Sequence, residues 1–208
     1  MHIVIRASEN QKLELLQKGF GDNVSVNWVD HLTEASHADA YFDLLFNDAD
    51  VHSNEFINDK PTFVHAVNAL CTEINKSNYI RLNAWNGFLS RPVIELVCCD
   101  NDLKKIITEI FTQIGRSFVF VSDDYGLVSA RIISMIINEA YYALEENVST
   151  KEQIDIAMKL GTNYPYGPFE WSEKIGLQNV LALLQKLSNQ NKRYTISGLL
   201  VNETQQFK

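Results

Sequence analysis

The chain has 208 residues and a formal net charge of -8, and 46% of its residues are hydrophobic while 21% are charged. This is the composition of an ordinary soluble protein that is long enough for one large domain or two modest ones. The sequence has no basic tract, which excludes nucleic acid as an expected partner.

Short apolar runs with the length of β-strands occupy the first part of the chain. Helix-length segments separate several of them, and Glu9–Lys18 and Leu103–Ile114 are each followed by a glycine. This alternation predicts an α/β layer with a mostly parallel sheet. The expected strands are Met1–Ala7, Val24–Val29, Ala38–Asn47, Pro61–Val67, Tyr79–Trp85, Val93–Cys99 and Phe118–Val121.

From Asp123 onward the pattern is helical only, so we expect an α/β domain over residues 1–122 and a helical domain over residues 123–208. Within the helical part, Leu127–Leu144 is apolar around most of its circumference. Such a segment predicts a helix that is buried on several sides, in a bundle or against a second subunit. Charged and amide side chains interrupt the run, which excludes a membrane span.

The rest of the helical part carries its own start and stop signals. A capping box at Ser149–Glu152 predicts the start of a short helix, and Gly161 is expected as its left-handed stop. Prolines and glycine then predict a loop. The expected elements are a helix over Thr150–Leu160, a loop around Pro165, Gly167 and Pro168, a helix over Gln178–Leu187, and a loosely packed tail over Arg193–Lys208.

The cysteines and the first residues bear on the compartment. Three cysteines are an odd number, and Cys98 and Cys99 are adjacent in an apolar run. We therefore expect free thiols in a reducing compartment. Neither C-x-x-C nor H-E-x-x-H spacing occurs, so no metal site is predicted. The first residues lack the layout of a signal peptide, and we expect a cytoplasmic protein.

An α/β layer that opens on a strand invites comparison with dinucleotide-binding folds. Those folds need G-x-G-x-x-G after the first strand, because the glycines let the backbone approach a pyrophosphate at a helix N-terminus. Here the first strand is followed by Arg6–Asn10, which contains an acidic residue and no glycine. Asp30 ends the second strand, where a ribose-binding carboxylate would lie, although an aspartate there is more often a turn residue. The sequence therefore predicts a Rossmann-like layer in which dinucleotide binding is impaired.

Several motifs of the helical part occur together and in order. They are NEAYYALEE (138–146), STKEQIDIAMKLGTNYPYGPFEW (149–171), IGL (175–177) and RYTISGLL (193–200). Together they resemble the C-terminal domain of 3-hydroxyacyl-CoA dehydrogenases. A weaker likeness extends through FVHAVNAL (63–70) and IRLNAWNGFLSRPVIELV (80–97), so the resemblance covers Thr62–Leu200. It implies a reduced Rossmann-like domain, a helical domain that dimerises, and a place in fatty acid metabolism.

The family oxidises the 3-hydroxyl group of an acyl-CoA and passes hydride to NAD. The resemblance implies that a histidine that takes the hydroxyl proton, and a glutamate that orients it, are matched here by Asn83 and Glu95. Asn86 matches an asparagine of the family, and Asn68 replaces a serine that contacts substrate. A carboxamide cannot accept a proton as imidazole does, and loss of a general base removes about 10² to 10⁴ in rate. His65 is a conceivable substitute base, although a strand-end histidine is more often simply hydrogen-bonded.

Three hypotheses follow for this chain. The favoured one is a catalytically degenerate member that keeps a cleft for an acyl-CoA-like ligand. The second is an active NAD-dependent 3-hydroxyacyl-CoA dehydrogenase with a substituted site. The third is a structural or regulatory subunit that pairs with an intact paralogue through its helical domain.

Overall fold

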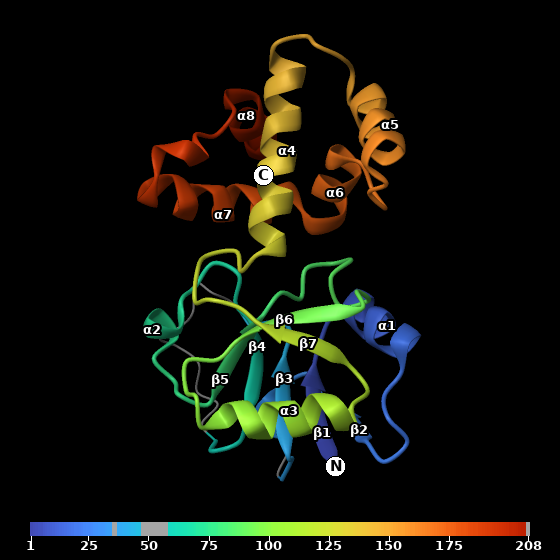
Figure 1. The fold of residues 1–208 in the computed structure, drawn as a ribbon, viewed down its shortest axis with the longest axis vertical. Helices are drawn as coiled ribbons and strands as arrows, with labels where there is room; N and C mark the ends of the chain where they lie inside the picture. Colours follow the sequence, from blue (N-terminus) through green and yellow to red (C-terminus); the bar gives the residue numbers. More distant parts are fainter. Residues whose placement is uncertain (35–36, 47–57, 207–208) are drawn as a thin grey trace. The chain divides into compact units, whose positions relative to one another are not determined.

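The computed structural model describes residues 1–34, 37–46 and 58–206, and the chain divides into two compact units, Met1–Leu127 and Val128–Lys208. The α/β unit is coloured blue to yellow-green in Figure 1, and the helical unit yellow to red. The division expected from the sequence lies after residue 122. Asn47, which ends one of the expected strands, lies outside the described residues, as do Phe207 and Lys208.

A seven-stranded sheet with the order β2-β1-β3-β4-β5-β6-β7 forms the centre of the α/β unit as the structure describes it. Neighbouring strands are parallel except β5 and β6, which pair antiparallel. This confirms the α/β layer with a mostly parallel sheet. The strands are β1 (His2–Arg6), β2 (Ser25–Trp28), β3 (Ala40–Asp43), β4 (Thr62–His65), β5 (Tyr79–Leu82), β6 (Val93–Val97) and β7 (Ser117–Phe120).

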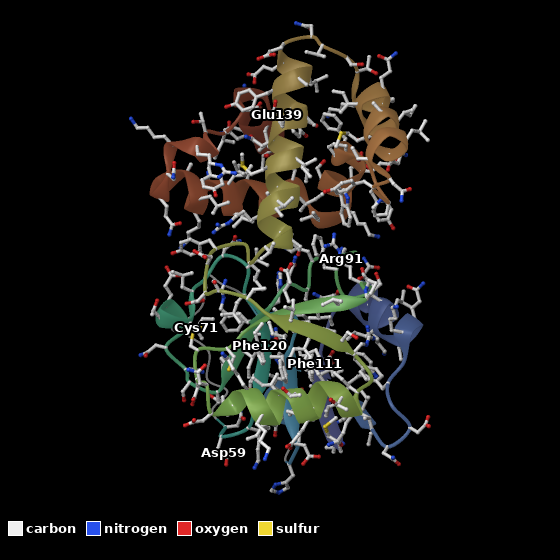
Figure 2. All side chains as sticks on the ribbon, in the orientation of Figure 1. Asp59, Cys71, Arg91, Phe111, Phe120 and Glu139 are labelled. Carbon is white, nitrogen blue, oxygen red and sulfur yellow. A yellow bond between two sulfur atoms is a disulfide. The ribbon has the colours of Figure 1, made fainter. Side chains whose placement is uncertain are left out.

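Successive side chains of a strand point to opposite faces, and both kinds are buried in the central strands, whereas β2 and β7 are partly exposed. Ile3 and Ile5 of β1 belong to the main core cluster, whereas Val4 belongs to a second cluster with Tyr41. The main cluster includes Phe111 of α3, which is labelled in Figure 2 and whose ring centroid lies 5.3 Å from that of Phe63. The helices of this unit are α1 (Glu9–Lys18), α2 (Cys71–Ile74) and α3 (Leu103–Gln113), and Leu32–Glu34 forms a 3₁₀ turn, η1.

The helical unit is built around one long helix. In Figure 1, α4 has α5 and α6 on one side and α7 and α8 on the other, and α4 packs against α6, α7 and α8. The helices are α4 (Ser129–Glu145), α5 (Lys151–Thr162), α6 (Pro168–Ile175), α7 (Leu177–Gln190) and α8 (Gly198–Gln206), and Lys192–Tyr194 forms a 3₁₀ turn, η3. None of the helices in the described part of the chain is both long enough and apolar enough to cross a membrane.

Two expectations for the middle of this unit were wrong. The helix α5 continues through Gly161, and Asn163 takes the left-handed conformation at its end, with φ of 55°. Asparagine, like glycine, is found in this conformation at helix ends. Gly161 and Asn163 are therefore two alternative stop signals, two residues apart. Pro168 begins α6 instead of belonging to a loop, because proline suits the first turn of a helix, where its missing N–H costs nothing.

The expectation of a loosely packed tail was also wrong. Ser197 and Leu200 are fully buried, and η3 and α8 lie within this segment. Asn138 of α4 explains the burial, since its Nδ2 donates to the carbonyl of Thr195 at 2.9 Å and its Oδ1 accepts from the N–H of Ser197 at 3.0 Å. The hydroxyl of Ser197 donates to Glu145 at 2.8 Å. The backbone of Thr195 and both the backbone and hydroxyl of Ser197 therefore find their hydrogen-bond partners in α4.

The expectation of free thiols is wrong for two of the three cysteines. Cys71 and Cys99 form a disulfide, with their Cα atoms 6.4 Å apart and a sequence separation of 28. Sequence spacing alone does not reveal such a pair, because the start of α2 and the residues after β6 meet only in the folded sheet. Cys98 is free, and burial raises the pKa of its thiol.

Candidate functional site

The four residues expected at the site come from one region of the α/β unit. Asn68 follows β4, whereas Asn83 and Asn86 follow β5, and parallel β4 and β5 end at the same edge of the sheet. Open α/β sheets bind ligands at this carboxyl edge. Asn83 is buried, with 5% of its surface exposed, while Asn68 and Asn86 are half-buried.

Asn83 makes one side-chain hydrogen bond and leaves one group without a partner. Its Oδ1 accepts from the N–H of Trp85 at 3.0 Å. Its Nδ2 is buried and has no hydrogen-bond partner in the part of the chain that the structure describes. A buried donor left unpaired costs about 1–3 kcal/mol, so this amide is a strong candidate for a bond to a ligand oxygen.

Glu95 lies opposite Asn83 by the register of the antiparallel pair. Arg81 faces Val97 and Leu82 faces Leu96, so the next position along β5 and β6 brings Asn83 against Glu95. Cβ atoms of directly opposite residues in such a pair lie about 4.5–5.5 Å apart. Asn83 comes directly after the last printed pair, so extending this register predicts the amide and the half-buried Glu95 as neighbours.

His65 ends β4 beside these residues but is not set up as a base. Its Nδ1 accepts from the N–H of Ala84 at 3.0 Å, which places its remaining proton on Nε2. Burial lowers the pKa of this imidazole to about 4, against the opposing effect of a hydrogen bond to the Leu82 carbonyl. At neutral pH the ring is uncharged, and the lone pair of Nδ1, which would have to take a proton, already accepts from the N–H of Ala84.

A second group of polar side chains fills the carboxyl edge at β1 and β3. The strand order reverses between these strands, which is where dinucleotides bind in related architectures. Here the guanidinium of Arg6 donates to the carboxylate of Asp43 at 3.2 and 3.4 Å and to the carbonyl of Asp30 at 3.1 Å. Burial raises the pKa of Asp43, while Arg6 acts in the opposite direction. Asp30 thus contributes its backbone here, and its side chain is exposed.

The N-terminus of α1 is occupied by its own capping box. The hydroxyl of Ser8 accepts from the N–H of Gln11 at 3.3 Å, and Oε1 of Gln11 accepts from the N–H of Ser8 at 2.9 Å. The Nε2 of Gln11 donates to the carbonyls of Leu44 and Ala84 at 2.9 and 3.0 Å. Gln11 is 6% exposed, so this side chain closes the edge of the sheet where a pyrophosphate would approach.

Glu14 holds the turn that contains Asn86. Its carboxylate accepts from the backbone N–H groups of Gly87, Leu89 and Ser90, the last two at 3.1 and 3.2 Å. The sequence did not single out Gln11 or Glu14. Ala84, a partner of Gln11, and Gly87, a partner of Glu14, each lie more than 70 residues away along the chain. Only the amphipathic helix around them was visible in the pattern.

NAD does not fit the residues at this edge. The N–H of Gln11 in the first turn of α1 is capped by Ser8, and the Arg6–Asp43 ion pair and the Gln11 side chain fill the reversal point of the sheet. Glu9 adds an exposed carboxylate in the first turn of α1. A phosphate placed there would lose hydrogen bonds and meet like charge.

Residues 126–203 match the family model described as 3-hydroxyacyl-CoA dehydrogenase, C-terminal domain. The chain is 41% identical over 103 residues to the 3-hydroxyadipyl-CoA dehydrogenase of Escherichia coli, which covers 49% of this chain and 22% of that protein. It is 37% identical over 125 residues to a probable 3-hydroxybutyryl-CoA dehydrogenase of Deinococcus radiodurans, which covers 58% of this chain and 45% of that protein. The matches thus span less than half of either relative.

Solved structures of two dehydrogenases resemble this chain in fold, over different parts of its length. The (S)-3-hydroxybutyryl-CoA dehydrogenase of Ralstonia eutropha superposes with a TM-score of 0.71 and 19% identity, over 97% of this chain and 92% of that one. The 3-hydroxybutyryl-CoA dehydrogenase of Escherichia coli K12 is 28% identical with a TM-score of 0.58, over 68% of this chain and 31% of that one. The first similarity extends through both units and concerns the fold.

Proposed function

We propose that this chain, which belongs to the 3-hydroxyacyl-CoA dehydrogenase family through residues 126–203, binds an acyl-CoA-type ligand without oxidising or reducing it. The observation that carries this proposal is the side chain of Asn83. It supplies a buried, unpaired N–H group within the described structure and no group that accepts a proton at neutral pH. The ligand feature that matches such a donor is a carbonyl oxygen, as in a thioester or a 3-oxo group.

Two independent features of the α/β unit support the proposed absence of redox activity. Asn83 replaces the expected base, and His65 cannot replace it because Ala84 occupies its Nδ1. The cofactor edge is closed by Gln11 and the Arg6–Asp43 ion pair. We expect each feature alone to lower turnover. A variant that restores the base would therefore still have a closed cofactor edge.

An assay of turnover tests the redox half of the proposal. The purified chain is mixed with acetoacetyl-CoA and NADH, and the nicotinamide absorbance is followed. We expect a rate at least about a hundredfold below that of an ordinary family enzyme, the lower end of the effect of a lost general base. The variant Asn83→His returns an imidazole opposite Glu95, and we expect it to stay inactive because the cofactor edge remains closed. A rate within a hundredfold for the wild-type chain would favour the active-enzyme hypothesis.

Calorimetry without any nicotinamide tests the binding half. We expect acetoacetyl-CoA to bind the wild-type chain and to bind Asn83→Asp at least about tenfold more weakly, which corresponds to roughly 1.4 kcal/mol. This substitution keeps the Oδ1 that accepts from Trp85 and removes the Nδ2 donor. Asn101→Asp, at an exposed position, is the control with the same change of charge. Equal affinity of Asn83→Asp and wild type would remove the assigned role.

The assembly we propose is a homodimer formed through the helical unit in the cytoplasm. Val128 and Ile132 follow one another by a helical turn and are 46% and 50% exposed, which is unusual for large apolar side chains. Light scattering should give twice the mass of the chain for wild type and the monomer mass for Ile132→Glu. A monomeric wild type would contradict the homodimer, and co-purification of a longer paralogue from the native cell would favour the heterodimer instead.

A further inference from the structure

The disulfide between Cys71 and Cys99 lies beside the Arg81–Asp123 ion pair, which is partly buried and which no part of the proposed function uses. Cys71 is the first residue of α2 and is labelled in Figure 2, and Cys99 follows β6. Cys99 is exposed to solvent, so a reductant can reach its sulfur. The adjacent thiol of Cys98 is half-buried, donates to the carbonyl of Asp100 at 3.0 Å, and has a raised pKa, which makes it a poor thiolate.

Asp123 connects this disulfide to the ion pair. Both of its carboxylate oxygens accept from the N–H of Cys71 at 3.1 Å, and a carboxylate oxygen lies within 4.8 Å of both sulfur atoms. The same carboxylate is paired with the guanidinium of Arg81, whose side chain is fully buried. A buried cation depends on its counter-ion, and removing one partner of such a pair is strongly destabilising.

The segment Asp123–Gly126 is held to α2 and its flanks by further contacts. The hydroxyl of Tyr125 donates to the carboxylate of Glu73 at 2.7 Å, and the N–H of Gly126 donates to the carbonyl of Val67 at 2.8 Å. Arg81 also donates to the carbonyl of Asp124 at 3.1 Å. The position of α2 therefore decides how this segment is anchored, and the disulfide is the covalent bond that fixes α2.

We propose that Cys71 and Cys99 form a reversible redox site that controls how firmly the segment Asp123–Gly126 is held. In a reducing compartment a disulfide is rare unless it is transient and catalytic or redox-sensing. The reductant is a dithiol. One of its thiolates attacks Sγ of the exposed Cys99, the Cys71–Cys99 bond breaks, and Cys71 leaves as a thiolate that takes a proton. The second thiol then displaces Cys99 as a free thiol, and the dithiol becomes a disulfide after giving up two electrons and two protons.

A metal ion is the alternative occupant of the reduced site. Two thiolates and the carboxylate of Asp123 are ligands that zinc accepts. The carboxylate is already the counter-ion of Arg81, so a metal ion would compete with the guanidinium for its oxygens. The redox role is the one that the contacts favour.

Hydrogen exchange of the full chain in its oxidised and reduced states tests the proposal. We expect dithiothreitol to raise the number of alkylated thiols from one to three, and to speed exchange at least about tenfold in peptides that cover residues 71–75 and 123–126, with α3 unchanged as the internal reference. Cys71→Ser/Cys99→Ser should behave as the reduced chain in either buffer. Cys98→Ser should keep the response.

Three results would overturn the proposal. The first is equal exchange at residues 123–126 in both states. The second is a disulfide that stays intact in a reducing glutathione buffer, which would make it a purely structural bond. The third is stoichiometric uptake of zinc by the reduced chain that prevents reoxidation. None of these measurements depends on acyl-CoA binding or turnover, so their failure is separate from that of the proposed function.

Discussion

The carboxylate of Asp155 in α5 accepts hydrogen bonds from the backbone N–H groups of Phe169 and Glu170 in α6, at 2.8 and 3.1 Å. Asp155 is 8% exposed, so the N-terminus of α6 is capped by a buried acid from another helix. Gly167 precedes α6, and a Cβ atom there would lie 2.3 Å from Cγ of Asp155. The aspartate and the glycine of the family motif are thus two halves of one contact.

Two glycines of the helical unit should respond in opposite directions to alanine. Gly167→Ala must displace Asp155 and expose two buried N–H groups, so we expect a loss of about 2–4 kcal/mol of the free energy of unfolding. Gly161→Ala lies within α5 with open space around it, so we expect a gain of about 0.5–1 kcal/mol. Denaturant unfolding of both variants measures the difference. A Gly167→Ala variant as stable as wild type would show that Asp155 is not needed as a cap.

Asn138 joins two family motifs that are far apart in sequence. Its replacement by alanine leaves the carbonyl of Thr195 and the N–H of Ser197 without their partner, and we expect a loss of about 2–4 kcal/mol on unfolding. Asn202→Ala, at an exposed position of α8, is the control and should change stability by less than about 0.5 kcal/mol. Thermal and denaturant unfolding give both values, and equal effects of the two substitutions would contradict the assigned contact.

Acid should destabilise the α/β unit through His65. Its pKa is about 4 in the folded chain and 6.5 for the ordinary side chain, so the unfolded chain binds a proton at a higher pH than the folded one. The contribution of neutral His65 is complete above pH 6.5, falls as the pH decreases from 6.5 to 4, and levels off below 4. Its upper limit is roughly 3 kcal/mol at 1.36 kcal/mol for each pKa unit.

Unfolding by denaturant at several pH values measures this contribution. His65→Gln keeps an oxygen that can accept from the N–H of Ala84 and should flatten the profile between pH 6.5 and 4. His31→Gln, at an exposed position, should keep the wild-type profile. If His65→Gln and wild type lose stability in parallel, the histidine is not the source of the acid sensitivity.

NAD should not bind at the carboxyl edge of β1 and β3. Calorimetric titration of the chain with NAD is expected to give no binding heat, while a dehydrogenase with the G-x-G-x-x-G loop in the same buffer serves as the positive control. The physical reason is that Ser8, Gln11 and the Arg6–Asp43 pair already use the groups that a dinucleotide would need. Micromolar binding of NAD would show that this polar edge opens.

Local patterns in the sequence were enough to predict the strands and the family of this protein. Short apolar runs predicted each of the seven described strands, because a strand that packs at least one face into a core needs such residues regardless of its neighbours. The order of motifs in the helical part identified the family that the comparison of residues 126–203 supports. The expectation that Asn83 and Glu95 belong to one site also came from sequence alone, and it stays a prediction that an extension of the β5–β6 register favours.

Only the tertiary structure decided what these residues contact. The Cys71–Cys99 bond, the capping of α6 by Asp155 and the burial of Ser197 each join positions from different elements, and sequence spacing carries no information about such distances. The same holds for Gln11, whose amide reaches the ends of two strands. Helix and strand signals are local, because they depend on backbone preference and periodic burial. Hydrogen bonds, ion pairs and disulfides depend on which surfaces the folded sheet and bundle bring together.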